Sequence, residues 1–196
     1  NWVVPLGPNV NGFEADLEAY MGENKRVVAL SAGTAAIHLA LIACGVGPGD
    51  EVICQSFTFC ASANPIAYLG ATPVFVDSER ETWNMDPLAL ERAFELYPDV
   101  KVVVMVNLYG TPAKMEELLA FCKKHGALVV EDAAESLGAT YCGQQTGTFG
   151  AYNAISFNGN KIITGSSGGM LLTDDKEAAD LARKWSTQSR EAASWY

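Results

Sequence analysis

The residue of this sequence with the clearest chemical potential is a single lysine within a polar and glycine-rich stretch. Lys161 follows the apolar run Ala154 to Phe157 and a short polar turn, and it precedes two isoleucines and the segment Gly165 to Gly169. Burial disfavours the charged form of an amine, so a lysine between apolar flanks can supply the neutral amine that forms a Schiff base with an aldehyde. Ser156, at the end of the apolar run, is well placed to hydrogen-bond a phosphate. For an isolated lysine, an ammonium group in water at the mouth of a turn is the commoner arrangement.

Two familiar nucleotide-binding motifs do not explain this stretch. A P-loop needs a lysine directly after glycine and a Ser or Thr directly after the lysine, whereas Asn160 separates Gly159 from Lys161 and Ile162 follows it. The glycines between positions 45 and 49 have the spacing GxGxG and follow a helical pattern. A dinucleotide fingerprint needs GxGxxG directly after a strand. Neither motif is therefore present.

The composition indicates a soluble globular domain. The chain has 196 residues, of which 49% are hydrophobic and 18% charged, enough for one sizeable core. Its formal net charge of -10 argues against non-specific binding of nucleic acid and against an anionic membrane surface. No apolar stretch reaches the length of a membrane span, and no signal-peptide pattern opens the chain. We therefore expect a cytoplasmic location.

The cysteines and histidines give no indication of a disulfide framework or a metal site. The 5 cysteines are an odd number without CxxC pairing, and several lie in apolar patterns, so we interpret them as reduced core residues. The chain has only 2 histidines, His38 and His125, and no clustered metal ligands. We expect no structural or catalytic metal.

Apolar strand patterns alternate with helical patterns along the chain. The predicted strands are Val27–Leu30, Asp50–Cys54, Pro73–Val76, Val102–Val106, Leu128–Glu131, Ala154–Phe157 and Gly168–Thr173. The predicted helices are Val10–Met21, Ala35–Cys44, Ala61–Leu69, Pro87–Leu96, Met115–His125 and Lys176–Trp185. Because the strands are apolar on both faces, we expect an α/β fold with a mainly parallel sheet flanked by helices. Ligands of such sheets bind at the carboxyl ends of the strands.

Several polar or aromatic residues follow the predicted strands at that edge. The segment Ser31 to Thr34 joins a strand to a helix N-terminus, which makes either an anion site suited to phosphate or a plain N-cap. Phe57 and Phe59 follow the next strand and could pack in the core or stack on a planar ring. Asp132 directly follows a third predicted strand.

Together with Ser156 and Lys161, these groups match the requirements of pyridoxal phosphate. The lysine holds the aldehyde of that cofactor as an imine, and a carboxylate keeps its pyridine nitrogen protonated so that electrons can drain into the ring. Each motif alone is weak evidence, whereas their order along the chain is much stronger.

Several sequence segments closely resemble the DegT/DnrJ/EryC1/StrS aminotransferases. The segments are SAGTAAIHLAL, GDEVICQSFTF, GATPVFVD, VEDAAESLGATY, GTFG and SFNGNKIITGSSGGM, and the resemblance runs from about Pro5 to Trp185. Members of this family are fold-type I pyridoxal phosphate enzymes that act mostly on nucleotide-linked keto sugars. The resemblance therefore implies this fold and this cofactor.

The resemblance also implies roles for individual residues. Lys161 matches the lysine that binds the cofactor aldehyde, and Asp132 matches the partner of the pyridine nitrogen. These two residues are the expected catalytic residues.

The remaining cofactor-binding positions follow from the same resemblance. Gly33, Thr34 and Ser156 correspond to phosphate-binding positions. Phe59 corresponds to the aromatic residue that stacks on the ring, and Glu135 falls where the family has Gln, His or Glu near the 3-hydroxyl group.

The chain departs from the family in two residues and in its length. Asn107 stands where many members have His, and Lys114 where many have Asp; both lie outside the cofactor motifs. Family members are about twice as long, so residues 1–196 are expected to be the large cofactor-binding domain, incomplete at its N-terminus and without the C-terminal small domain. The exposed apolar start, Trp2 to Val4, agrees with this expectation.

The resemblance predicts transfer of an amino group from an amino acid, with glutamate as the expected donor, to a nucleotide-linked keto sugar. It also predicts a homodimer with the active site at the subunit interface. Sugar dehydratases of the same family carry histidine in place of the lysine, so Lys161 disfavours dehydration. The alternative is a cofactor-binding or regulatory domain without turnover. If the chain were a purely structural α/β domain, the occurrence of these polar and aromatic residues at the ends of several strands would have to be chance.

Overall fold

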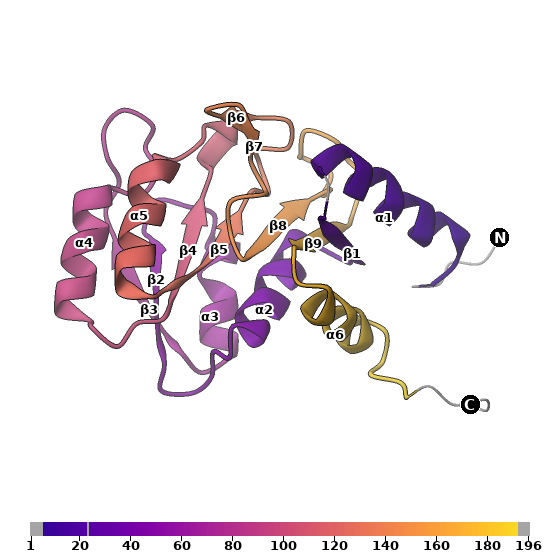
Figure 1. Cartoon of the computed structure of the whole chain (residues 1–196), viewed down its shortest axis with the longest axis horizontal. Helices are drawn as coiled ribbons and strands as arrows, with labels where there is room; N and C mark the ends of the chain where they lie inside the picture. The colour runs from indigo at the N-terminus through magenta and orange to yellow at the C-terminus, as the bar shows by residue number, and fades with distance from the viewer. Residues whose placement is uncertain (1–5, 23, 192–196) are drawn as a thin grey trace.

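A seven-stranded sheet runs through the molecule, with strand order β1-β9-β8-β5-β4-β2-β3 (Figure 1). The computed structural model describes residues 6–22 and 24–191, and the expectation for Trp2 to Val4 lies outside them. The strands of this sheet are β1 (Arg26–Leu30), β2 (Glu51–Gln55), β3 (Thr72–Val76), β4 (Val102–Val106), β5 (Leu128–Asp132), β8 (Tyr152–Ser156) and β9 (Gly169–Thr173).

Most neighbouring strands of the sheet are parallel. β3, β2, β4, β5 and β8 pair in parallel, whereas β9 pairs antiparallel with both of its neighbours, β1 and β8. Every residue of β4, β8 and β9 is buried, as expected for strands that are covered on both faces. The prediction of a mainly parallel sheet in an α/β fold is therefore confirmed.

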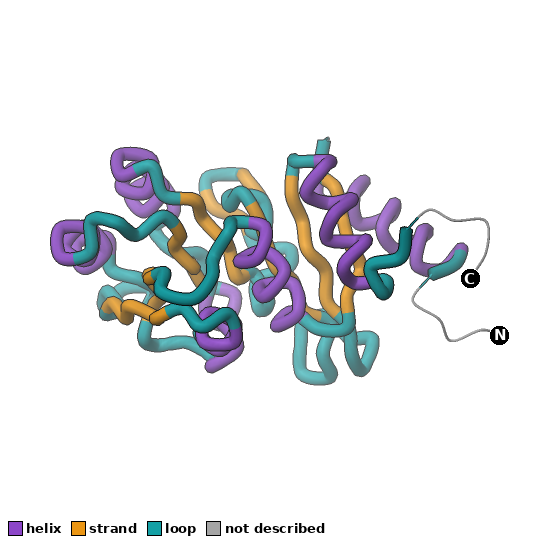
Figure 2. Tube along the Cα trace, turned by 90° about the horizontal axis from the view of Figure 1, so that it is seen from below, coloured by secondary structure: helices purple, strands orange, loops and turns teal. Residues whose placement is uncertain are grey.

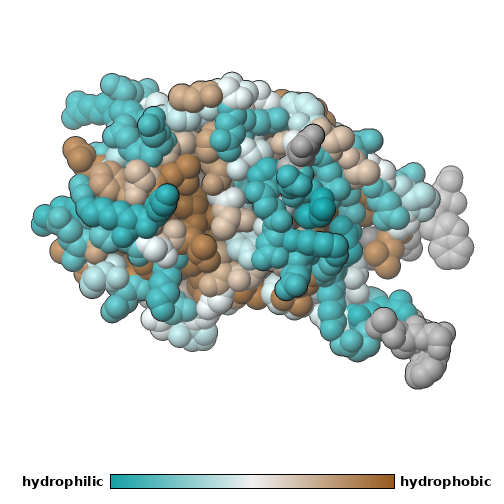
Figure 3. All heavy atoms as spheres, viewed as in Figure 1, coloured by the Kyte–Doolittle hydropathy of each residue, from teal (hydrophilic) through white to brown (hydrophobic). Residues whose placement is uncertain are grey.

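Helices cover both faces of the sheet (Figures 1 and 2). They are α1 (Pro8–Met21), α2 (Gly33–Ala43), α3 (Asn64–Tyr68), α4 (Pro87–Leu96), α5 (Met115–His125) and α6 (Lys176–Ser186). One core cluster contains residues of α2, α3 and α6. On the opposite face, a second cluster contains residues of α4 and α5, and a third contains a residue of α1. Figure 3 shows the molecule in the view of Figure 1, where hydrophilic side chains cover much of the surface and apolar atoms form a strip beside α5.

Helices α4 and α5 have the bounds that the sequence predicts, because their ends carry clear capping signals. The Asp86 side chain accepts a hydrogen bond from the Leu88 N–H, and Pro87 occupies the first turn of α4. Helix α5 has acidic residues in its first turn and basic residues in its last turn, and it ends at Gly126 in the left-handed conformation with φ 68°.

The predicted helix Ala61–Leu69 is wrong, since the segment forms two shorter elements. A 3₁₀ turn spans Cys60–Ser62, and α3 spans only Asn64–Tyr68. Pro65 lies in the first turn of α3, where its missing N–H costs little. The proline therefore marks a new helix start within the segment.

The two-stranded hairpin of β6 (Thr140–Tyr141) and β7 (Gln144–Gln145) is not among the elements predicted from the sequence. Its turn contains Cys142 and Gly143, both with positive φ. Two-residue strands are too short to show an alternating apolar pattern, so hydrophobic periodicity gives no signal for them.

The interpretation of all cysteines as core residues is correct for Cys54 and Cys122 but wrong for Cys60 and Cys142, which are exposed. The exposed pair lie in a 3₁₀ turn and a hairpin turn, which were not predicted as such. All five are free thiols, and burial raises the pKa of Cys44, Cys54 and Cys122 to about 12. Among the described residues, no helix is both long and apolar enough to cross a membrane.

Candidate functional site

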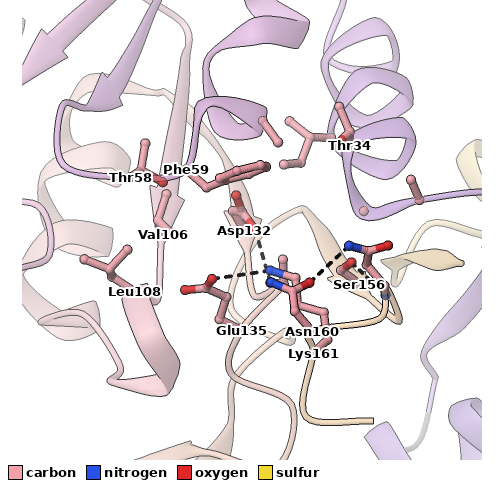
Figure 4. Close-up of a pocket in the computed structure, with 16 residues that line it drawn as sticks. Thr34, Thr58, Phe59, Val106, Leu108, Asp132, Glu135, Ser156, Asn160 and Lys161 are labelled. Atoms are coloured by element: carbon pink, nitrogen blue, oxygen red, sulfur yellow. Dashed lines mark hydrogen bonds and ion pairs between the residues drawn. The ribbon is translucent and has the colours of Figure 1, made fainter. Parts of the chain in front are cut away.

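A cavity of about 310 Å³ lies at the carboxyl ends of the parallel strands (Figure 4). It is lined by every residue that the resemblance assigns to the cofactor, namely Gly33, Thr34, Phe59, Asp132, Glu135, Ser156 and Lys161. These residues come from the N-terminus of α2 and from the ends of, or segments after, β2, β5 and β8. The topology thus brings together residues that are far apart in the sequence. Ser31 and Phe57 are not among the lining residues.

The Lys161 side chain is mostly covered, but its neighbours in sequence do not cover it. Only 12% of this side chain is exposed, whereas Ile162 and Ile163 are 62% and 60% exposed. The apolar run before the lysine is buried as expected, whereas Ile162 and Ile163 lie in an exposed loop and do not cover the lysine. The Nζ atom instead lies 3.3 Å from Oε1 of Glu135, with which it forms an ion pair.

The carboxylate of Glu135 connects the lysine to the segment after β4. Its Oε2 accepts a hydrogen bond of 2.8 Å from the backbone N–H of Tyr109. Tyr109 has φ 51°, in the left-handed region that is uncommon for residues other than glycine. The Glu135 carboxylate therefore stabilises both the position of the Lys161 amine and an unusual backbone conformation at the edge of the sheet.

Asp132 is a buried carboxylate in the wall of the cavity. Its Oδ2 accepts a hydrogen bond of 2.6 Å from the Ser62 hydroxyl, and its Oδ1 accepts one of 3.1 Å from the Ala134 N–H. Burial raises the pKa of Asp132, and the Ser62 and Ala134 hydrogen bonds and the nearby charge of Lys161 oppose that shift. A cation placed in the cavity beside this carboxylate would stabilise its ionised form.

The residue before Asp132 fixes the end of β5. Glu131 is fully buried and accepts hydrogen bonds from the N–H groups of Gly147 and Phe149 and from the Asn107 side chain, at 2.7, 2.8 and 2.8 Å. Asn107 also accepts a hydrogen bond from the Ala113 N–H. The asparagine that departs from the family pattern therefore has a structural role behind the cavity.

The N-terminus of α2 forms one end of the cavity. Ala32, the N-cap residue, is extended and gives no side-chain cap, so the plain N-cap expected as one alternative is not observed. A Cβ atom on Gly33 would lie 2.9 Å from the Ser156 Cβ, closer than such atoms approach in proteins. The glycine therefore allows the first turn of the helix to lie directly against Ser156. A helix N-terminus in contact with a serine side chain is suited to bind an anion such as phosphate.

Phe59 supplies an aromatic face to the cavity. The residue is 67% exposed, and Figure 4 shows its ring edge-on above Asp132, so that one flat face points toward the side of the cavity that holds Lys161. The exposure argues against the alternative of a core residue. A planar ring bound between Phe59 and the floor of the cavity could stack on this face.

Sequence reasoning missed two residues that position the lining groups. Ser62 hydrogen-bonds Asp132 across 70 positions, and Tyr109 hydrogen-bonds Glu135 through its backbone. Neither Ser62 nor Tyr109 lies in a sequence motif that would indicate its hydrogen-bond partner. These contacts depend on β2, β4 and β5 being neighbours, which the sequence alone does not specify.

Comparisons with known proteins identify the family of this chain. The model of the DegT/DnrJ/EryC1/StrS aminotransferase family matches residues 1–195. The protein EpsN of Bacillus subtilis is 54% identical to this chain, over 100% of this chain and 51% of its own length. GDP-perosamine synthase of Caulobacter vibrioides is 45% identical, over 91% of this chain and 47% of its own length. The chain thus spans about half the length of these curated relatives.

Solved structures show the same fold. The PLP form of Spr1654 from Streptococcus pneumoniae superposes with a TM-score of 0.89 at 31% identity, over 97% of this chain and 53% of that protein. The match therefore extends through the whole sheet and both helical layers. Because the family model matches residues 1–195, the chain belongs to the DegT/DnrJ/EryC1/StrS aminotransferase family.

Proposed function

We propose that this chain is the cofactor-binding large domain of a pyridoxal phosphate-dependent aminotransferase. The complete protein would transfer an amino group from an amino acid, with glutamate as the expected donor, to a nucleotide-linked keto sugar. The observation that carries the proposal is the placement of Lys161, Asp132, Phe59 and the N-terminus of α2 around one cavity. The family and the relative named GDP-perosamine synthase support the sugar substrate.

The groups that line the cavity fit pyridoxal phosphate in chemistry. The amine of Lys161 would hold the aldehyde carbon, and the carboxylate of Asp132 would face the ring nitrogen. The contact of Gly33 with Ser156 gives the phosphate a helix N-terminus and a hydroxyl group. When bound, this cofactor supplies an electron sink that weakens the bond between the substrate carbon and its hydrogen.

The residues of the chain would each contribute a separate action. The buried Asp132 carboxylate, oriented by Ser62 and Ala134, stabilises positive charge on the ring nitrogen. The Glu135 carboxylate, whose Oε1 lies 3.3 Å from Nζ, would hold the Lys161 amine in position in the cavity. The Nζ atom of Lys161 would then be the base that takes the proton from the substrate carbon next to the transferred nitrogen.

The assembly and location of the protein are part of the same proposal. We propose a homodimer whose partner subunit closes the cavity, because Phe59, which lines it, and Tyr109, whose N–H binds the lining Glu135, are 67% and 80% exposed. We also propose that the protein acts in the cytoplasm, which is consistent with its five free cysteines. A cofactor-binding domain without turnover is the second candidate, since the chain spans about half the length of its relatives.

The proposal is tested by cofactor uptake and by the response to an amino donor. The purified chain is mixed with pyridoxal phosphate, treated with borohydride, and digested for mass spectrometry. We expect the reduced cofactor on Lys161, and a change of the cofactor absorbance when glutamate is added to unreduced protein. If both this chain and the full-length protein bound the cofactor but showed no absorbance change with amino acids, the result would support a cofactor-binding domain without turnover. Attachment at other lysines would contradict both.

Asp132→Asn is expected to slow the reaction with glutamate by about 100-fold or more, while cofactor affinity changes only a few-fold. The amide fills the same space but cannot stabilise a positive ring nitrogen. Stopped-flow absorbance of the glutamate half-reaction measures the rate, and a titration measures the affinity. Asp180→Asn, at an exposed aspartate of α6, is the matched control. A wild-type rate for Asp132→Asn would show that another group faces the ring nitrogen.

A further inference from the structure

Two exposed aromatic rings lie together at the edge of the sheet outside the cavity. The ring centroids of Phe57 and Trp83 are 5.8 Å apart, and the planes are tilted by 58°. The two residues are 48% and 60% exposed, and neither is among the residues that line the cavity. Two tilted rings leave apolar faces open to solvent, an arrangement that packing in the core does not explain.

Trp83 is held at the surface by a tight loop between β3 and α4. A bridge between Ser78 and Met85 closes the loop, and the Trp83 N–H donates to the Glu79 carbonyl at 3.1 Å. The Glu79 N–H in turn donates to the Asn84 carbonyl at 3.0 Å. Trp83 has φ 63°, a left-handed conformation that is unfavourable for a bulky residue. Such strain persists only where surrounding contacts enforce it, and it is concentrated at functional positions.

Side-chain contacts within the loop enforce this conformation. The Glu79 carboxylate accepts hydrogen bonds of 2.8 Å from the N–H groups of Glu81 and Thr82 and a further bond from the Thr82 hydroxyl. Lys114 lies 3.5 Å from Glu79 and 2.9 Å from Glu81, which connects the loop to the start of α5. The loop is therefore built as a rigid support for an exposed indole ring.

Buried hydrogen bonds connect both rings to the wall of the cavity. Asn84, next to Trp83, accepts a bond of 2.8 Å from the N–H of Leu108, which lines the cavity. The Gln55 side chain donates to the Phe57 carbonyl at 2.9 Å and accepts from the Met85 N–H at 3.2 Å. The aromatic pair therefore has a fixed position relative to the cavity.

We infer that Trp83 and Phe57 form a stacking site for the base of a nucleoside diphosphate. This inference rests on the proposed function, because it assigns a place to the nucleotide part of the proposed substrate. Every nucleobase presents a flat face that stacks on aromatic side chains. A position beside the cavity suits a base that is separated from the reacting sugar by a diphosphate. The nearby Lys114 is already paired with two glutamates. We therefore expect the nucleotide to be bound here by ring stacking rather than by an ion pair between Lys114 and a phosphate.

The site is tested with UDP, GDP and pyrophosphate as probes, because pyrophosphate lacks the ring. Isothermal titration calorimetry is performed on the unsubstituted chain and on Trp83→Ala. Loss of a stacking face is expected to weaken binding of UDP or GDP by about tenfold or more and to leave pyrophosphate binding unchanged. Trp83→Phe keeps a ring and is expected to retain most of the affinity. Phe57→Ala is expected to act in the same direction as Trp83→Ala.

Tyr68→Ala provides a matched control, because Tyr68 is also 60% exposed and also contacts a second ring, that of His38. It is expected to bind both nucleotides like the unsubstituted chain. Equal nucleotide affinity of Trp83→Ala and the unsubstituted chain would overturn the inference, as would no nucleotide binding by the unsubstituted chain. A change in sedimentation without a change in nucleotide affinity would assign the rings to a subunit contact instead. Cofactor attachment to Lys161 in the same samples tests the proposed function separately.

Discussion

Lys161→Ala is expected to abolish covalent uptake of pyridoxal phosphate and all amino transfer while the fold remains intact. The amine is the only group of this side chain that the proposed chemistry uses, and no other lysine of the described part of the chain lines the cavity. Its ion-pair partner, Glu135, keeps the hydrogen bond from the Tyr109 N–H and is 23% exposed, so it can be hydrated when the amine is lost. We therefore expect the free energy of unfolding to change by only about 1 kcal/mol.

Two measurements separate the chemical effect of this substitution from a structural one. Borohydride trapping followed by mass spectrometry reports attachment, and urea denaturation reports stability. Lys176→Ala is the matched control, since Lys176 pairs with a carboxylate on exposed α6. The control should keep full cofactor uptake. More than a small residual activity in Lys161→Ala would show that a different amine binds the cofactor.

The elements that the sequence predicts best are those whose ends carry local signals. Helix α5 begins after Lys114 and ends at Gly126, and both the periodicity and the terminal charges indicate these bounds. Strand β4 is a run of apolar residues between polar ends, and its bounds agree with the prediction as well. By contrast, the segment Ala61–Leu69 is apolar enough to predict one helix, but Pro65 starts a new helix within it.

The residues of the candidate site could be predicted, but their contacts could not. Asp132 and Lys161 follow apolar strands, and parallel strands end at one edge of a sheet, so their approach to one cavity follows from the fold class. The partners of these side chains depend on strand order and on loop conformation. Ser62 reaches Asp132 from a 3₁₀ turn that was predicted as a regular helix. Glu135 binds the backbone of Tyr109, and side-chain patterns carry no information on such a contact.

The glycine-rich segment after Lys161 illustrates how a motif can be recognised before its physical reason is known. In the sequence, Gly165 to Gly169 is a glycine-rich segment that leads into the predicted strand Gly168–Thr173. In the structure, Gly168 has φ 123°, whereas Gly169 is required for another reason. A Cβ atom on Gly169 would lie 2.2 Å from the Ala32 carbonyl carbon and 2.4 Å from the Gly33 nitrogen. The start of β9 therefore packs directly against the backbone at the N-terminus of α2.

Gly169→Ala is consequently expected to destabilise the protein by about 3 kcal/mol or more, since the clash is with backbone atoms that cannot rotate away. The same junction places Gly33 against Ser156, so cofactor affinity should fall together with stability. Urea denaturation measures the first effect, and titration with pyridoxal phosphate under native conditions measures the second.

Gly159→Ala is the control for this substitution, because Gly159 lies in the same stretch but its Cβ would meet only the Ser166 carbonyl oxygen, at 3.9 Å. We expect its free energy of unfolding to lie within about 0.5 kcal/mol of the unsubstituted protein. An equal free energy of unfolding for Gly169→Ala and Gly159→Ala would contradict the close contact between β9 and α2. The phosphate site inferred at that helix N-terminus would then lose its structural support, because the position of Gly33 against Ser156 depends on the same packing.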